Sequence, residues 1–164
     1  MRLGLTLALG ILIADQFSKL WVLQYFGADT TSDPTAIYSS VKVNEIFDFV
    51  LTWNRGVSFG LFNQDSPYNA WIFSTLALTI VGILLFWLKK SESLWTKVPI
   101  GLIIGGALGN VIDRLRLGAV VDFLSFHIDR YYWPAFNIAD SAISIGAVIM
   151  IAEAWLVKPK KDEV

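Results

Sequence analysis

Four long apolar segments constrain the fold of this chain more than any other feature. They lie at about residues 3–26, 70–88, 98–117 and 138–157. Each is close to the roughly 20 residues that a helix needs to cross a bilayer. The first segment resembles a cleaved signal peptide, but it is too long and contains polar residues in its second half. We therefore expect all four segments to be retained transmembrane helices.

The composition agrees with a membrane protein. Hydrophobic residues make up 55% of the 164 residues and charged residues 16%, whereas soluble domains contain about 25% charged residues. The net charge of −1 gives no indication of nucleic-acid binding. The absence of cysteine and the single histidine argue against disulfides, a thiolate nucleophile and a zinc site. We predict a mainly α membrane protein, one membrane domain over residues 1–164, with no metal or cofactor.

The basic residues predict the orientation of the helices. Cytoplasmic loops are enriched in lysine and arginine. With four spans, seven basic residues fall on one side: Arg2, Lys89, Lys90, Lys97, Lys158, Lys160 and Lys161. Both termini are therefore expected in the cytoplasm, with the loop at residues 27–69 on the outer face.

The loop at residues 27–69 is long enough to require structure of its own. Phe47–Trp53 is rich in aromatic and β-branched residues, which favour strands. Asn54–Gly56 could form a turn, and Val57–Phe62 could return as a second strand. Val120–His127, outside this loop, is typical of another short strand. We expect a small β-sheet on the outer face.

The third apolar segment combines small residues with a polar face. Its glycines repeat every four residues, at Gly101, Gly105 and Gly109. This spacing lets helices pack closely in lipid. The simplest interpretation is packing alone. Asn110, Asp113 and Arg114 share one helix face because they are spaced i, i+3 and i+4. Asp113 and Arg114 could neutralise each other near the interface, and the same face could also line a wet cleft.

Asp122 and Asp140 are the candidate reactive groups. They lie 18 residues apart, next to apolar segments where acids are costly. Two carboxyl groups that share one proton can activate water and protonate a leaving amine. Asp122 has apolar neighbours, which raise a carboxyl pKa, whereas Asp140 begins the fourth helix, where the helix dipole favours ionisation. We hypothesise that Asp140 is mainly the base and Asp122 mainly the protonated partner.

Structural interpretations of these polar residues remain open. Asn137 could cap the fourth helix, with Asp140 completing a capping box. Asp122 could be a solvated strand residue near the interface. Asp15 and Lys19, spaced i and i+4, could form a self-neutralising pair.

Two other functions compete with the aspartyl interpretation. Gly56–Gly60 matches the G-x-S-x-G nucleophile motif, so Ser58 with His127 as base could form a serine intramembrane hydrolase. That motif normally requires a strand–turn–helix context, which the sequence does not predict. The charged residues within the helices could instead belong to a small non-enzymatic carrier, although the paired broken helices of many transporters are not evident.

Five short motifs occur in order along the chain. They are Asp15-Gln16 with Lys19, Asn54-Arg55-Gly56 with Phe59-Gly60, Gly109-Asn110 with Asp113-Arg114, Val121-Asp122-Phe123, and Phe136-Asn137 with Ala139-Asp140. Each is weak alone, but the set is specific, and with the four-helix layout it resembles the lipoprotein signal peptidases, the type II signal peptidases of bacteria. The resemblance extends over about residues 10–150.

The resemblance implies an aspartyl endopeptidase of the bacterial inner membrane. It would remove the signal peptide from diacylglyceryl-modified prolipoproteins, before the lipidated cysteine, near the periplasmic face. It implies Asp122 and Asp140 as the catalytic dyad. It also implies supporting or substrate-contacting roles for Asp15, Asn54, Arg55, Gly56, Asn110, Asp113, Arg114 and Asn137. The expected partners are the prolipoprotein, membrane lipids and a globomycin-like peptide inhibitor, and the expected state is a monomer. A segment within residues 27–45 could act as a lid.

Overall fold

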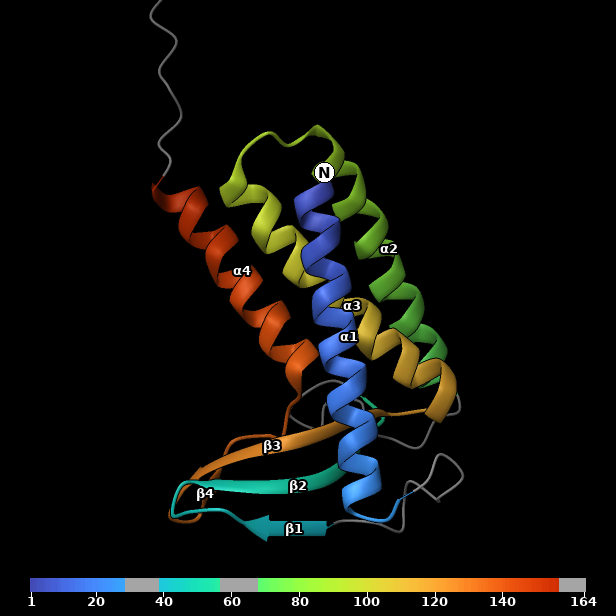
Figure 1. Cartoon of the computed structure of the whole chain (residues 1–164), viewed down its shortest axis with the longest axis vertical. Helices are drawn as coiled ribbons and strands as arrows, with labels where there is room; N and C mark the ends of the chain where they lie inside the picture. Colours follow the sequence, from blue (N-terminus) through green and yellow to red (C-terminus); the bar gives the residue numbers. More distant parts are fainter. Residues whose placement is uncertain (29–38, 57–67, 157–164) are drawn as a thin grey trace, which may run out of the picture.

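The computed structural model describes residues 1–28, 39–56 and 68–156. Within these ranges the chain forms four helices, α1 (Arg2–Tyr25), α2 (Asn69–Lys90), α3 (Leu94–Leu117) and α4 (Ile138–Leu156). Each is long and apolar enough to cross a membrane. The helices form one bundle, and a β-sheet lies at the end opposite to the N-terminus (Figure 1). The predicted fold class, four membrane helices with a small sheet, is confirmed.

Helix α3 is the centre of the bundle. In its apolar window 61% of residues are buried, against 22%, 22% and 17% in α1, α2 and α4. Its glycines allow this position: a Cβ atom on Gly101 would lie 2.5 Å from the carbonyl oxygen of Gly4, and one on Gly105 would lie 2.5 Å from that of Ala8. The glycine repeat therefore lets the backbones of α1 and α3 approach closely, as the packing interpretation predicts.

Helix α3 begins earlier than residue 98, the start that the sequence pattern predicts. Ser93 is the N-cap, and its Oγ accepts a hydrogen bond from the Trp95 N–H (3.2 Å), so the helix starts at Leu94. The helix ends where predicted. Gly118 adopts a left-handed conformation (φ 74°) and its N–H donates to the Arg114 carbonyl (3.0 Å).

The sheet has four antiparallel strands in sequence order. They are β1 (Ser39–Lys42), β2 (Phe47–Asn54), β3 (Val120–Ile128) and β4 (Tyr131–Tyr132). Strands close to the predicted 47–53 and 120–127 are present. The predicted return strand at 57–62 lies outside the described residues, and the described neighbours of β2 are β1 and β3.

A hydrophobic cluster attaches the sheet to the end of α1. Val22 and Leu23 of α1 pack with Leu51 of β2 and with Val121 and Phe123 of β3. Side chains alternate between the two faces of a strand. Burial of the two β3 side chains in this cluster therefore turns the residue between them to the opposite face, toward the first turn of α4.

Candidate active site

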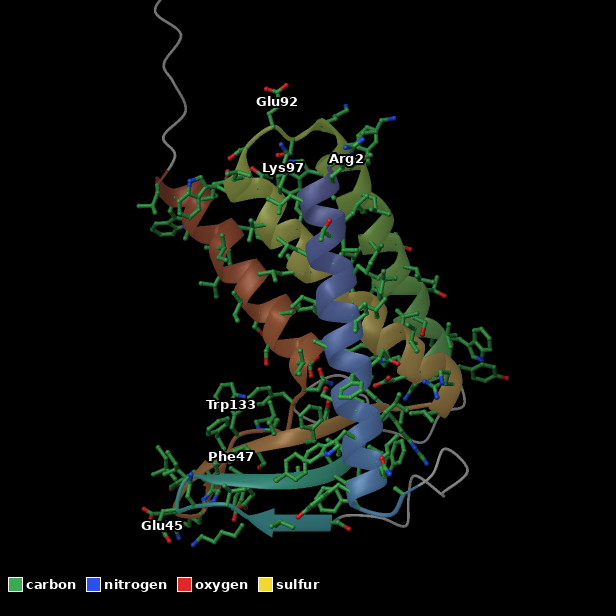
Figure 2. The ribbon with its side chains drawn as sticks, viewed as in Figure 1. Arg2, Glu45, Phe47, Glu92, Lys97 and Trp133 are labelled. Atoms are coloured by element: carbon green, nitrogen blue, oxygen red, sulfur yellow. The ribbon has the colours of Figure 1, made fainter. Side chains whose placement is uncertain are left out.

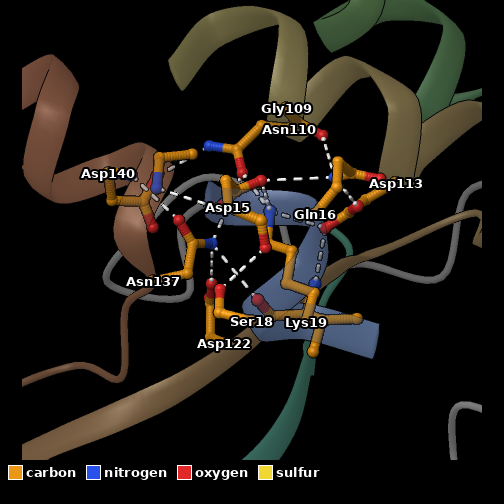
Figure 3. Close-up of polar contacts among 12 residues, drawn as sticks. Asp15, Gln16, Ser18, Lys19, Gly109, Asn110, Asp113, Asp122, Asn137 and Asp140 are labelled. Carbon is orange, nitrogen blue, oxygen red and sulfur yellow. Dashed lines mark hydrogen bonds and ion pairs between the residues drawn. The ribbon is translucent and has the colours of Figure 1, made fainter. Parts of the chain in front are cut away.

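Asp122 of β3 and Asp140 of α4 meet through Asn137. The Nδ2 of Asn137 donates to Asp122 Oδ1 (2.6 Å), and its Oδ1 accepts the backbone N–H of Asp140 (2.9 Å). Asn137 is itself fully buried. Figure 3 shows the two acids on either side of this amide. One side chain thus connects the strand to the start of the helix, because it binds the carboxyl group of Asp122 and the backbone of Asp140.

Asp122 is buried, with 1% of its surface exposed, so its interpretation as a solvated strand residue is wrong. Its Oδ2 accepts a hydrogen bond from Asn54 Nδ2 (3.1 Å). Burial and the negative charge of Asp140 together raise the pKa of Asp122 to about 8, against the smaller opposing effect of its hydrogen bonds. Asp122 is therefore mainly protonated at neutral pH.

Asp140 lies in the first turn of α4, where the helix dipole favours a negative charge. Its Oδ1 accepts a hydrogen bond from Asn110 Nδ2 (2.8 Å). Asn137 is an N-cap, as the structural interpretation predicts. The Asp140 carboxylate also accepts a hydrogen bond from the backbone N–H of Asn137, which closes the predicted capping box, and Asn110 of α3 adds a second contact. The first turn of α4 therefore combines a local capping box with a tertiary contact.

A second acidic cluster surrounds Lys19 of α1. The Lys19 Nζ lies 2.8 Å from Asp15 Oδ2 and 2.8 Å from Asp113 Oδ2, and all three side chains are at most 3% exposed. The predicted Asp15–Lys19 pair is thus confirmed and gains a third member. The predicted neutralisation of Asp113 by Arg114 is wrong, because Asp113 binds Lys19 and Arg114 Nη2 donates to the Gly56 carbonyl (3.2 Å).

The Lys19 cluster is joined directly to the candidate catalytic pair. Lys19 Nζ donates to Asn110 Oδ1 (3.0 Å), and Asp15 Oδ1 accepts the backbone N–H of Ala139 (2.9 Å). Gln16 Nε2 also donates to Asp113 Oδ1 (2.9 Å). Lys19 and Gln16 were not among the predicted site residues. The available signal was the lysine spaced i+4 from an acid on an apolar helix.

The Asn54–Gly56 turn closes the site on the sheet side. Asn54 Oδ1 accepts the Gly56 N–H (3.1 Å), and its Nδ2 reaches Asp122, so one amide both shapes the turn and contacts the pair. Arg114 ties the Gly56 carbonyl to α3. Arg55 lies within this turn. The predicted residues linked by the hydrogen bonds above are Asp15, Asn54, Gly56, Asn110, Asp113, Arg114, Asp122, Asn137 and Asp140.

Two openings lead to Asp140. A cavity of about 280 Å³ has a polar end and an apolar wall from α2, α3 and α4, and it is lined by Asn54, Ala77, Ile80, Ile103, Ala107, Asn110, Arg114, Val120, Asp140 and Ile143. A groove of about 340 Å³ runs along α4 and is lined by Trp133, Pro134, Ala135, Phe136, Asp140, Ser141, Ser144 and Ile145. The site can therefore receive a ligand that is part polar and part apolar.

His127 lies at the other end of β3 from the acids. It follows Asp122 by five residues, about 17 Å along an extended strand. Its Nε2 is 3.5 Å from Asp48 Oδ1, and its ring stacks on Tyr132 with centroids 4.7 Å apart. Ser58 lies outside the described residues. In the described part of the chain, no group of three or more His, Asp or Glu side chains is arranged to hold a metal ion.

Comparison with known proteins identifies the family. Residues 7–156 match the family described as signal peptidase (SPase) II. A lipoprotein signal peptidase of Nitrobacter hamburgensis is 40% identical over 163 residues, covering 97% of this chain and 95% of the relative. One of Aeromonas hydrophila is 41% identical over 162 residues, covering 96% of this chain and 91% of the relative.

Solved structures agree with the sequence comparison. A bacterial membrane enzyme solved by the in meso method at 2.3 Å superposes with a TM-score of 0.81 and 28% identity, covering 100% of this chain and 94% of that chain. A second, at 1.9 Å, gives a TM-score of 0.78 and 30% identity, covering 97% and 96%. The family match spans the four helices and both acids, and it confirms the resemblance seen in the five motifs. The chain belongs to the signal peptidase II family.

Proposed function

We propose that this protein is an aspartyl endopeptidase that removes the signal peptide from diacylglyceryl-modified prolipoproteins, cleaving before the lipidated cysteine. The observation that carries the proposal is the junction of Asp122 and Asp140 through Asn137, with Asp140 open to a cavity that is polar at one end. Family membership supplies the substrate class, since the relatives are lipoprotein signal peptidases.

The two acids have different roles in hydrolysis, one as the base and the other as the acid. Ionised Asp140 removes a proton from water while the water oxygen attacks the scissile carbonyl carbon. Protonated Asp122 donates a hydrogen bond to the carbonyl oxygen, which becomes negatively charged in the tetrahedral intermediate. The proton taken by Asp140 then passes to the leaving amine as the C–N bond breaks. The raised pKa of Asp122 supports its assignment as the acid.

The shape of the cavity fits a lipid-modified peptide. Its polar end, at Asn54, Asn110 and Arg114, can bind the backbone around the scissile bond. Its wall of alanine and isoleucine side chains can hold an apolar chain, which is either the signal peptide or an acyl group. The exclusion of water from this wall would strengthen hydrogen bonds at the acids.

We place the protein in the bacterial inner membrane as a monomeric, single membrane domain. Arg2 and Lys97 lie at the end of the bundle opposite to the sheet (Figure 2), and Lys89 and Lys90 close α2 at that end. The positive-inside rule then puts both termini in the cytoplasm and the acids near the periplasmic face. A globomycin-like peptide would occupy the same cleft. About half of the proposed lid, within residues 27–45, lies outside the described residues.

The proposal is tested with purified protein in detergent and a diacylglyceryl-modified prolipoprotein. The natural chain should release the signal peptide, and Asp122→Asn and Asp140→Asn should each fold and fail to release it. Normal cleavage by either folded variant would remove that acid from the mechanism. Absence of cleavage by the natural chain, with substrate that a known enzyme of the family processes, would contradict the proposed activity.

The two competing functions make different predictions. A serine hydrolase would require Ser58 and His127, but His127 lies beside Asp48 and Tyr132 at the far end of β3 from the acids. A carrier would move ions or solutes across liposomes that contain the natural chain, without cleaving peptides. Flux measurements and cleavage assays on the same preparation separate these functions.

A further inference from the structure

The ammonium of Lys19 is surrounded by three oxygens. They are Asp15 Oδ2 at 2.8 Å, Asp113 Oδ2 at 2.8 Å and Asn110 Oδ1 at 3.0 Å. A lysine ammonium has three N–H donors and no acceptor, so each donor has one oxygen to bind. Asn110 must therefore present its amide oxygen to Lys19, because its amide nitrogen would bring two donors together.

The orientation of the Asn110 side chain determines whether its amide nitrogen or its amide oxygen faces the Asp140 carboxylate. With the amide oxygen on Lys19, the Nδ2 of Asn110 points to Asp140 Oδ1 at 2.8 Å. A donated N–H favours the ionised carboxylate, whereas an amide oxygen in the same place would require a protonated Asp140. Rotation of this amide by half a turn would thus exchange one protonation state of Asp140 for the other.

Asn137 cannot hold Asn110 in place by itself. Its Nδ2 lies near three oxygens, those of Asp122 Oδ1 (2.6 Å), the Val121 carbonyl (3.2 Å) and Asn110 Oδ1 (3.3 Å). An amide nitrogen carries two hydrogens, and the two shorter contacts use them. The bond from Lys19 is shorter and charge-assisted, and is therefore the stronger restraint on Asn110.

We infer that Lys19 is a positioning residue, which holds the Asn110 amide in the orientation that keeps Asp140 ionised as the base. The inference rests on the proposed aspartyl mechanism. It goes beyond the ion pairs of Lys19, because it assigns to this lysine an effect on the reaction that passes through Asn110. The described bonds of Lys19 go to Asp15, Asp113 and Asn110, and its charge reaches the two acids of the candidate pair only from a distance.

The test must separate loss of the restraint from loss of charge. The charged groups packed around the site include Asp15 and Lys19 of α1, Asp113 and Arg114 of α3, Asp122 of β3 and Asp140 of α4, and Arg55 lies in the adjacent turn. Lys19→Met alone leaves two buried carboxylates without their cation. The double variant Lys19→Met/Asp113→Asn replaces two carboxylates and one ammonium by one carboxylate, so the net charge of this cluster stays at −1.

The measurement is the pH profile of kcat/KM for prolipoprotein cleavage. In Lys19→Met/Asp113→Asn the acidic limb of the profile should move to higher pH by about one unit or more. At pH values below this limb, kcat/KM should therefore fall by about tenfold. Activity should recover toward alkaline pH. A purely structural role would lower activity by the same factor across the profile. Glu153→Gln is the matched control, because it removes a carboxylate of α4 that accepts a hydrogen bond from Thr96 of α3 (2.9 Å). The pH profile of this variant should match that of the natural chain.

A second comparison tests whether the effect passes through Asn110. In an Asn110→Ala background, the double replacement should cause no further shift of the acidic limb, because the orienting contact is already absent. The inference would be overturned if the double replacement shifted the acidic limb equally with and without Asn110. It would also be overturned if the double replacement left the acidic limb of the otherwise natural chain unchanged. These failures are distinct from failure of the proposed function, which would appear as normal cleavage by Asp122→Asn or Asp140→Asn.

Discussion

Two acidic clusters lie side by side in this protein. They differ in their counter-ions, and one member of the second, Asp140, is only half-buried. The first holds Asp15 and Asp113, each 2.8 Å from the Lys19 ammonium. The second holds Asp122 and Asp140, whose described hydrogen bonds come from amides of the side chains and backbone. Both clusters are built at the junction between the helices and the sheet.

The difference shows how the same residue type serves two purposes. A buried carboxylate with an adjacent cation is neutralised, and its removal mainly affects stability. Burial and the negative charge of Asp140 raise the pKa of Asp122, so Asp122 retains its proton to higher pH than an ordinary carboxyl group. The Lys19 ammonium therefore distinguishes the first cluster from the second, whose carboxyl groups we propose as the reactive ones.

The largest effect is expected from asparagine replacements in the two clusters. Asp122→Asn and Asp140→Asn should each lower kcat by about 10³-fold or more, since each removes a group that transfers or holds a proton. Asp15→Asn should retain far more activity per folded molecule. Single-turnover cleavage, normalised to the folded fraction, measures the contrast. Equal losses in both clusters would contradict the division proposed here.

The next effect concerns stability. Lys19→Met leaves Asp15 and Asp113 buried without their cation and should cost about 3–5 kcal/mol of the free energy of unfolding. Thermal unfolding in detergent would detect it. Lys42→Met is the matched control, because the Lys42–Glu45 pair (3.1 Å) is exposed on both sides, and its Tm should be unchanged. A natural Tm for Lys19→Met would show that the cluster is not stabilised by its cation.

A smaller effect is expected at Gly109, where a Cβ atom would collide with the Asp15 carboxylate. Gly109→Ala should displace this side chain and destabilise the protein by about 1–3 kcal/mol. Gly82→Ala is the control, because a Cβ there has nothing within 4 Å and alanine favours helix. If the two variants unfold at the same temperature, close packing of α3 on the acid is not important.

The pH dependence of stability sharpens the comparison further. The pKa of Asp122 is raised to about 8 in the folded protein, against about 3.9 in an unfolded chain. The folded state therefore binds the extra proton between these values, and stability falls as pH rises from about 4 to about 8. Asp122→Asn should flatten this part of the Tm–pH curve. An unchanged slope would mean that Asp122 is not the proton-holding acid.

The smallest effect is expected for Ser58→Ala. The aspartyl mechanism uses neither Ser58 nor His127, so cleavage should stay within about twofold of natural, a difference worth less than about 0.5 kcal/mol in the barrier. Complete loss of cleavage in a folded Ser58→Ala variant would revive the serine alternative.

Much of the candidate site could be predicted because its residues are charged or polar in or beside apolar segments, where such residues are rare. Asp122 and Asp140 are acids beside apolar segments, and the five motifs preserve their order along the chain. Errors arose where partners are distant in sequence. The sequence pairs Asp113 with its neighbour Arg114, whereas the cation that Asp113 binds, Lys19, lies on another helix.

The sequence by itself determined the four membrane helices, the presence of a small sheet and the identity of the two candidate acids. Hydrophobic length and the alternation of side chains are local properties, so they can be read along the chain. Tertiary structure alone decided the pairing of β2 with β3, the central position of α3 and the direction of the Asn110 amide. These depend on groups that come together only when the chain is packed, since a hydrogen bond requires a donor and an acceptor within about 3 Å.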